Sequence, residues 1–357
     1  MGNDLENLQE VLQRDPSNFQ ARRKLSILLA NNGFNEEALS NLEYLTKYFP
    51  EDAEIWYNIG ILQEKLKKIE EAKKSYLKAI EISPQNDFYY NLGEILVELK
   101  EWDSAIDAFK TVLKTDTQDG NCYFNLGLCY YNKDEINLAT DNFQKAIELN
   151  PKDIFALFHL GYIYQNNGLT NFAVENYNKV LEISPDYSWA YFNLASIAYK
   201  NNNLEEARRY LSKTIEYNYM DIEAYKLLTK ICIKENEIEE IISILQTRIK
   251  KEENGDLYYI LSQVYKKLGE KPQYIHCLKM AIKNHLTLTY EYNIVKKELE
   301  YNDNETKLEE NEFEEYDSLE DNIEDDVDYD NFESDEDFAD EDDEDEIYDD
   351  DFEDDEE

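Results

Sequence analysis

The chain is poor in basic residues and has no long apolar run. Its 357 residues include 36 Lys and Arg against 80 Asp and Glu, which gives a formal net charge of −44. A chain of this charge repels phosphate backbones and lacks a basic patch, so nucleic acid is excluded as a partner. No stretch reaches the roughly 18 apolar residues that span a bilayer, and the N-terminus has no basic and apolar leader. We therefore expect neither a secretory signal nor membrane insertion.

Cysteine and histidine are also scarce, with four cysteines and three histidines in the chain. Cys122 and Cys129 are separated by about 10 Å on one expected helix, which is too far for a disulfide. We expect reduced cysteines packed in the core, and hence a cytoplasmic protein. No zinc-spaced cluster, phosphate-binding glycine loop or nucleophile elbow is visible. The sequence therefore predicts a protein that is not an enzyme, with no catalytic residues, no metal site and no cofactor.

The acidic excess is concentrated at the C-terminal end. Residues 301–357 contain 34 acids and one base, Lys307, whereas residues 1–300 contain 46 acids and 35 bases. A segment so highly charged buries too little apolar surface to fold alone, so we expect a disordered acidic tail over residues 301–357. Three roles stay open for this tail. The first is folding on a basic partner, and the second is only to keep the chain soluble. The third is folding back near Arg22, Arg23 and Lys24, where the tail competes for a binding groove.

Residues 1–300 are organised by an internal repeat. Pro16, Pro50 and Pro84 follow one another at steps of 34 residues, as do Pro151 and Pro185. A five-residue motif recurs between these prolines, with an aromatic, an amide and a small residue at fixed places. Its copies are Trp56-Tyr57-Asn58-Ile59-Gly60, Tyr89-Tyr90-Asn91-Leu92-Gly93, Tyr123-Phe124-Asn125-Leu126-Gly127, Leu157-Phe158-His159-Leu160-Gly161 and Tyr191-Phe192-Asn193-Leu194-Ala195. Downstream, an alanine is followed four and seven residues later by apolar residues, as in Ala72, Tyr76 and Ala79.

These units resemble tetratricopeptide repeats, each a pair of antiparallel helices that buries its apolar faces against its neighbours. The resemblance implies an all-α fold, a right-handed α-solenoid of about eight helix-turn-helix units. We expect a half-repeat over residues 1–18, the eight units over residues 19–286, a capping helix over residues 287–300, and then the tail. The expected units start near Phe19, Ala53, Asn86, Gly120, Ile154, Ser188, Ile222 and Gly255.

The mid-helix glycines predict a close approach between helices. Gly93 is about 1 kcal/mol less favourable than alanine inside a helix, so it needs a packing reason. We expect the facing helix to approach it at Ala105, which is also small. Gly33 and Gly168 suit the turn between two helices, where a left-handed backbone is required.

A second stripe on the first helix of each unit is the candidate binding site. Aromatic residues and a column of amides lie about 100° away from the buried face. By the resemblance, these positions line a concave groove, and the amides are similar to the asparagine ladder that holds an extended peptide in some family members. The predicted groove residues are Tyr57, Asn58, Tyr90, Asn91, Phe124, Asn125, Phe158, His159, Phe192 and Asn193. The alternative interpretation is that these side chains pack between adjacent units.

One narrower function is disfavoured by the residues themselves. Chaperone-binding members of the family hold a C-terminal acidic peptide with a clamp of Lys and Arg. Arg23 and Lys24 begin such a pattern, but Ser26 replaces the expected Asn, and later units supply Glu54 and Asp87 instead of cations. We therefore expect a non-enzymatic scaffold or adaptor that binds a peptide segment of a partner protein in the groove. The alternatives are a chaperone-like binder of basic proteins through the acidic tail, and an accessory subunit of a larger assembly.

Overall fold

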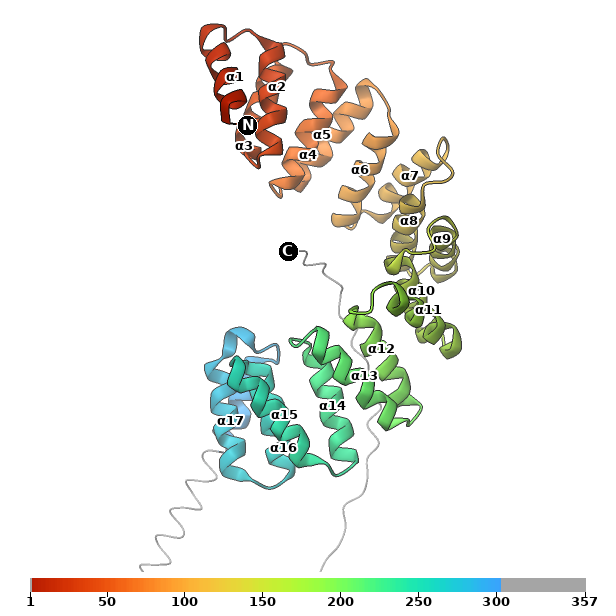
Figure 1. Ribbon diagram of the computed structural model, residues 1–357, viewed down its shortest axis with the longest axis vertical. Coiled ribbons are helices and arrows are strands. Elements are labelled where there is room, and N and C mark those ends of the chain that lie inside the picture. Colours follow the sequence, from red (N-terminus) through yellow and green to blue (C-terminus); the bar gives the residue numbers. More distant parts are fainter. Residues whose placement is uncertain (1, 303–357) are drawn as a thin grey trace, which may run out of the picture. The chain divides into compact units, whose positions relative to one another are not determined.

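The computed structural model describes residues 2–302, and all regular structure in this part of the chain is helical (Figure 1). The tail predicted for residues 301–357 lies almost entirely outside the described residues. In chain order the helices are α1 (Gly2–Arg14), α2 (Phe19–Asn31), α3 (Asn35–Thr46), α4 (Ala53–Lys65), α5 (Ile69–Ile82), α6 (Asn86–Glu98), α7 (Trp102–Leu113), α8 (Gly120–Asn132), α9 (Ile136–Leu149), α10 (Ile154–Asn166), α11 (Thr170–Ile183), α12 (Ser188–Lys200), α13 (Leu204–Tyr217), α14 (Ile222–Lys234), α15 (Ile238–Lys251), α16 (Gly255–Lys267) and α17 (Lys271–Lys283), then a short 3-10 helix, η1 (His285–Thr287), and a helical stretch over residues 292–302.

The helices from α2 to α17 form consecutive hairpins, each made of an even-numbered first helix and an odd-numbered second helix. Each second helix also packs against the first helix of the next hairpin. The prediction of an all-α solenoid of helix-turn-helix units is confirmed. The eight expected unit starts are the first residues of α2, α4, α6, α8, α10, α12, α14 and α16.

Most first helices begin where a side chain caps the free backbone amides. Asp52 Oδ1 accepts a hydrogen bond from the amide of Ile55, and Asp153 Oδ1 accepts one of 3.0 Å from that of Ala156. Such a cap stabilises a helix start by about 1 kcal/mol. The same bond recurs at the starts of α2, α8, α14 and α16, where the capping residues are Asn18, Asp119, Asp221 and Asn254.

The turn within each hairpin requires one residue of positive φ, as predicted for Gly33 and Gly168. Gly33 has φ 81° and Gly168 has φ 72°. The equivalent turns of five other units use a residue with a side chain, among them Lys100 at φ 58°. Each of these side chains adds backbone strain, because a left-handed conformation brings Cβ close to the following carbonyl oxygen. The residues that share this turn position are Gly33, Lys67, Lys100, Asp134, Gly168, Asn202, Asn236 and Gly269.

Gly168→Ala should lower the free energy of unfolding by about 1–2 kcal/mol, which is the cost of the left-handed conformation for a residue with a Cβ. No atom lies within 4 Å of the added Cβ, so the change isolates backbone strain from crowding. Urea denaturation followed by circular dichroism measures it. Lys100→Gly is the matched control and should not lower stability, because glycine relieves strain already present there. An unchanged urea midpoint for Gly168→Ala would contradict this explanation of the turn.

The facing helix approaches the mid-helix glycines closely, as expected, and the nearest atoms belong to an aromatic ring. A Cβ added at Gly93 would lie 2.6 Å from the ring of Phe109, one helical turn beyond Ala105. The ring projects further than the alanine, so it fills the space above the glycine. In the same way, a Cβ added at Gly60 would lie 2.5 Å from the ring of Tyr76. The same pairing recurs in the next two units, as Gly127 with Phe143 and Gly161 with Tyr177.

The small residue of each first helix and the residue that faces it on the second helix change size together from unit to unit. Where the small residue is glycine, the facing residue is a ring. In the other units the small residue is larger and leucine faces it: Ser26 with Leu42, Ala195 with Leu211, Thr229 with Leu245 and Ser262 with Leu278. All four leucines are buried. Each crossing therefore keeps a nearly constant volume, which close packing requires.

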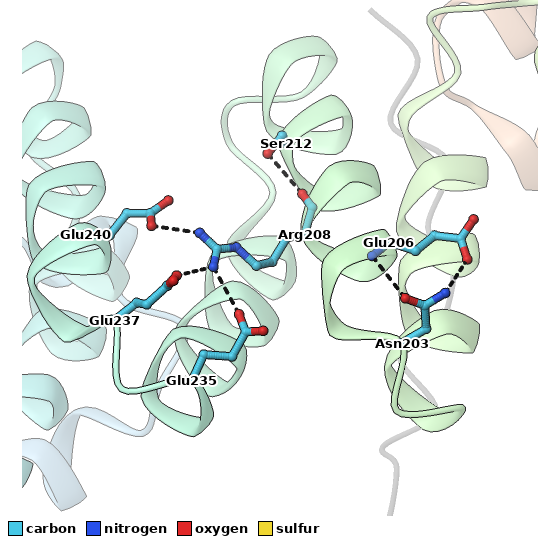
Figure 2. Close-up of polar contacts among 7 residues, drawn as sticks. All are labelled: Asn203, Glu206, Arg208, Ser212, Glu235, Glu237 and Glu240. Carbon is cyan, nitrogen blue, oxygen red and sulfur yellow. Dashed lines mark hydrogen bonds and ion pairs between the residues drawn. The ribbon is translucent and has the colours of Figure 1, made fainter.

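Neighbouring hairpins are also linked by ion pairs from a second helix to the turn and the second helix of the next hairpin. Arg208 on α13 reaches Glu235 at 2.9 Å, Glu240 at 2.7 Å and also Glu237, all in the following hairpin (Figure 2). The second helix of another hairpin uses the same position, where Lys73 pairs with Glu101 at 2.5 Å.

Candidate functional site

The first helix α4 has an open face about 100° away from its buried stripe. On α4 the second, fifth, sixth, ninth and thirteenth residues fall within about 100° of one another at about 3.6 residues per turn. None of these five residues is buried. By contrast, Ile55, Ile59 and Leu62, on the buried stripe, are each only 1–3% exposed. We use "open face" for these five positions on every first helix. On α4 they are Glu54, Tyr57, Asn58, Ile61 and Lys65.

The predicted aromatic column lies on this face but is partly covered by the second helices. Tyr57 is half-buried, and its ring lies 5.8 Å from that of Tyr76 on α5. Tyr90 and Phe124 are placed in the same way, each 5.8 Å from the ring of its own second helix. These ring contacts stabilise the hairpins, and Tyr57 and Phe124 also contact rings of the following unit, so the column is only partly accessible. Phe192 is also half-buried.

The predicted amide column forms bonds between neighbouring units. Asn91 Nδ2 donates to the Tyr57 hydroxyl at 3.2 Å, and Asn125 Nδ2 donates to the Tyr90 hydroxyl at 3.3 Å. Asn58 is exposed and donates to the backbone carbonyl of Glu54 in its own helix. An amide has two N–H donors and two acceptor lone pairs, so each of these bonds uses only part of its capacity. The amides therefore take part in packing between units, as the alternative interpretation expected, and still offer polar groups to a ligand.

Two of the predicted groove residues are buried. Phe158 is 3% exposed and packs 5.4 Å from the ring of Tyr187, while Asn193 is 7% exposed and donates to the backbone carbonyl of Trp189. Neither side chain reaches solvent. The accessible part of the predicted set is therefore Tyr57, Asn58, Tyr90, Asn91, Phe124, Asn125, His159 and Phe192.

His159 lies in an aromatic cage. Its ring stacks on Phe143 with a centroid distance of 5.4 Å and an interplanar angle of 6°, and Phe124 and Tyr131 lie 5.9 and 6.5 Å away. Burial lowers the pKa of His159 to about 4. The imidazole is therefore neutral at pH 7 and acts as one more flat ring in the stack.

Acidic side chains gather around the two tyrosines of α4 and α6. Burial raises the pKa of Tyr57, and the charges of Asp87, Glu54 and Glu64 raise it further against a bond from Asn91. Asp87 and Glu54 are exposed. The open face of these two helices is therefore strongly negative.

Glu94 on α6 also lies near other carboxylates. Burial raises its pKa, and the charges of Glu64 and Asp119 add to the effect, while a hydrogen bond with Tyr90 opposes it. Three carboxylates thus repel one another across α4, α6 and the start of α8.

Two exposed aromatic side chains on the open face were missed from the sequence. Phe155 on α10 is 53% exposed and Trp189 on α12 is 44% exposed. They occupy the second position of their helices, where Glu54 and Asp87 stand in earlier units. The change from acid to ring at one repeat position was the available signal, but it was used only to disfavour the Lys and Arg clamp.

A histidine and a cysteine come together in one cleft of the described residues. A cleft beside α15 is lined by Tyr258, Tyr265, His276 and Cys277 among others. Burial raises the pKa of Cys277 to about 11, so its thiol stays protonated and is a poor nucleophile. Within residues 2–302, no group of three His, Cys, Asp or Glu side chains is placed to hold a metal ion, and no helix is long and apolar enough to cross a membrane.

All four cysteines are free and buried, as expected from the spacing of Cys122 and Cys129. Burial raises the pKa of the Cys129 thiol to about 12. Buried thiols of this kind pack as small apolar side chains.

Comparison with protein families agrees with this architecture. Four models of the tetratricopeptide repeat match the chain, at residues 53–86, 89–123, 120–153, 142–171 and 170–231. No match was found among curated proteins.

Solved structures show the same fold. A tetratricopeptide repeat protein from Parabacteroides merdae ATCC 43184 is 17% identical over 70% of this chain and 98% of its own, with a TM-score of 0.50. PilF of Pseudomonas aeruginosa is 16% identical over 59% of this chain and 97% of its own, with a TM-score of 0.51. These identities concern the fold alone. YrrB, described as having an unusual peptide-binding site, is 26% identical over 51% of this chain and 95% of its own, with a TM-score of 0.44.

Proposed function

The chain is a tetratricopeptide repeat protein, from a family of typically non-enzymatic scaffolds for protein–protein interaction, and we propose that its open face binds a peptide segment of a partner protein. The proposed contacts are the accessible rings and amides of α4, α6, α8, α10 and α12. The observation that supports this most is the exposure of Phe155 and Trp189 on that face, 53% and 44%. Large exposed rings are common anchors of binding energy in protein interfaces.

The chemistry of the face suits a peptide. Asn58 and Asn125 offer amide groups, which pair with the N–H and C=O of a peptide bond whatever its side chain is. Tyr57 and Phe124 offer ring edges that already have fixed positions, so binding orders few side chains. A rigid wall of this kind holds an extended segment with little loss of conformational entropy.

Site-specific photo-crosslinking tests the proposal in the full chain. A photoreactive residue is placed at Asn58, Asn121 or Phe155 on the open face, and at Glu71 or Phe172 on second helices as controls. All five positions are exposed. We expect crosslinks from the open-face positions to one contiguous segment of one partner protein, identified by mass spectrometry of native extract. Equal crosslinking from Glu71 and Phe172, or crosslinks scattered over many unrelated proteins, would contradict it.

The alternative is that residues 301–357 capture basic proteins through their charge. These residues lie outside the described part of the chain, except for Tyr301 and Asn302. The same crosslinking separates the two, because tail capture predicts no preference for open-face positions. Electrostatic capture also weakens as ionic strength rises.

A further inference from the structure

The open face changes its chemistry along the chain. On α4 and α6 it carries Glu54, Asp87, Glu94 and Glu98 together with Lys65. On α8, α10 and α12 the same second position is held by an amide and then by two rings. These three residues are Asn121, Phe155 and Trp189. One half of the face is therefore acidic and the other half is aromatic.

The acidic half is suited to a cation. The pKa of Glu94 is raised by desolvation and by the charges of Glu64 and Asp119, while its side chain stays exposed, so a positive group placed there relieves repulsion already present in the free protein. The half-buried rings of Tyr57 and Tyr90 lie among these carboxylates and offer apolar surface to the methylene stem of a long cationic side chain. Lys and Arg side chains satisfy both features at once.

The aromatic half is suited to an apolar side chain. The Phe155 ring lies 6.4 Å from that of Phe124, so the two form one apolar surface across α8 and α10. Tyr162 on α10 lies 6.4 Å from Tyr131 on α8 and extends this surface along both helices. Charged ligand groups gain little here, whereas a buried apolar side chain gains about 25 cal/mol per Å².

The two halves are continuous. Asn91 joins α6 to α4 by its bond to Tyr57, and Asn125 joins α8 to α6 by its bond to Tyr90. Ring contacts then join α8 to α10, and the 5.4 Å contact of Phe158 with Tyr187 joins α10 to the start of α12. Neighbouring helices lie about 8–10 Å apart, so about 12 residues of extended chain, at about 3.3 Å each, reach from one half to the other.

We propose that the open face from α4 to α12 takes a segment with Lys or Arg at one end and aromatic or branched apolar residues at the other. The basic end lies over Glu54, Asp87 and Glu94, and the apolar end lies over Phe155 and Trp189. This rests on the proposed function and adds the chemistry and the order of the partner's side chains. The net charge of −44 also draws a basic segment toward the protein.

Defined peptides and the full chain test the proposal by fluorescence anisotropy. Two labelled 12-residue peptides carry four Lys and four Trp or Leu in separate blocks, in either order, because the direction of the bound chain is open. A third peptide has the same composition with the blocks interleaved. We expect one block peptide to bind at least about tenfold tighter than the interleaved one, which corresponds to about 1.4 kcal/mol.

Two pairs of variants are matched for position and exposure. Glu54→Lys with Asp87→Lys changes first-turn acids of the open face, and Glu70→Lys with Glu71→Lys changes exposed first-turn acids of α5. Phe155→Ala removes an open-face ring, and Phe172→Ala removes a ring of α11 that is equally exposed at 53%. Both open-face changes should weaken the favoured peptide about tenfold, while both controls change its affinity less than about twofold.

Salt dependence separates the two halves of the face. Binding by Phe155→Ala should keep the salt dependence of the wild type, and binding by the Glu54→Lys, Asp87→Lys protein should lose most of it. Two results would overturn the proposal: equal affinity of the protein for all three peptides, or equal affinity of all variants for the favoured peptide. Either result would mean that the peptides bind away from the open face, for example on the acidic C-terminal residues. If open-face crosslinks identify a partner segment without this basic and apolar pattern, the proposed function stands and this inference fails.

Discussion

Phe109→Ala should lower the free energy of unfolding by about 3–5 kcal/mol, the range for truncating a buried phenylalanine. The Phe109 ring is 0% exposed and fills the space above Gly93. Alanine at this position leaves a cavity that the rigid α6–α7 crossing cannot close. Urea denaturation measures the loss, and hydrogen exchange of the α6 and α7 amides should show it first, because neighbouring units stabilise each other only locally.

A compensating pair shows whether complementary volume is the cause. Ala195 with Leu211 is the natural pair in a later unit, so Gly93→Ala with Phe109→Leu transplants a combination that the fold already uses. Gly93→Ala alone should cost about 1–3 kcal/mol, because its Cβ overlaps the ring. The double variant should be more stable than the sum of the single changes predicts, by at least about 1 kcal/mol. Strict additivity would contradict the volume argument.

His159→Asn should remove a large part of the acid sensitivity of the fold. The pKa of His159 is lowered to about 4 by burial, against about 6.5 for histidine in an unfolded chain. Between these values the unfolded chain binds a proton that the folded chain excludes, so stability falls as pH drops from about 6.5 to about 4. The contribution reaches about 3 kcal/mol at the lower limit, at about 1.4 kcal/mol per pKa unit.

Urea denaturation at pH 7 and pH 4.5 checks the sign and the size. The wild type should lose about 2–3 kcal/mol more than His159→Asn over this interval, because both proteins share every other titrating group. Equal losses in the wild type and His159→Asn would show that His159 is protonated in the folded chain.

The hairpins were predictable from the sequence because their packing repeats. A period of 34 residues and a motif of ring, amide and small residue located the first residue of every first helix. The partner of Gly93 was not predictable from the pattern. Ala105 and Phe109 recur together in the sequence, and only the direction of the side chains shows that the ring reaches the glycine.

The candidate site was predicted less well, for the same physical reason. A residue that recurs in every unit recurs because every unit needs it, so Asn91 and Asn125 proved to bond neighbouring units. Exposed positions are not constrained by packing, so their residue type can differ from unit to unit and suit a ligand. Phe155 and Trp189 occupy such a position. The proposed binding site therefore rests on variation against the repeat, whereas recurrence predicted the packing between units.

Hydroxyl-radical footprinting of the full chain, with and without the partner segment identified by crosslinking, tests the central claim most directly. Phe155 and Phe172 are both 53% exposed, so they are oxidised at comparable rates in the free protein. The proposed binding mode predicts that the bound segment slows oxidation of Phe155 and Trp189 severalfold and leaves Phe172 unchanged. Unchanged oxidation of Phe155 and Trp189 in the saturated complex would contradict binding on the open face.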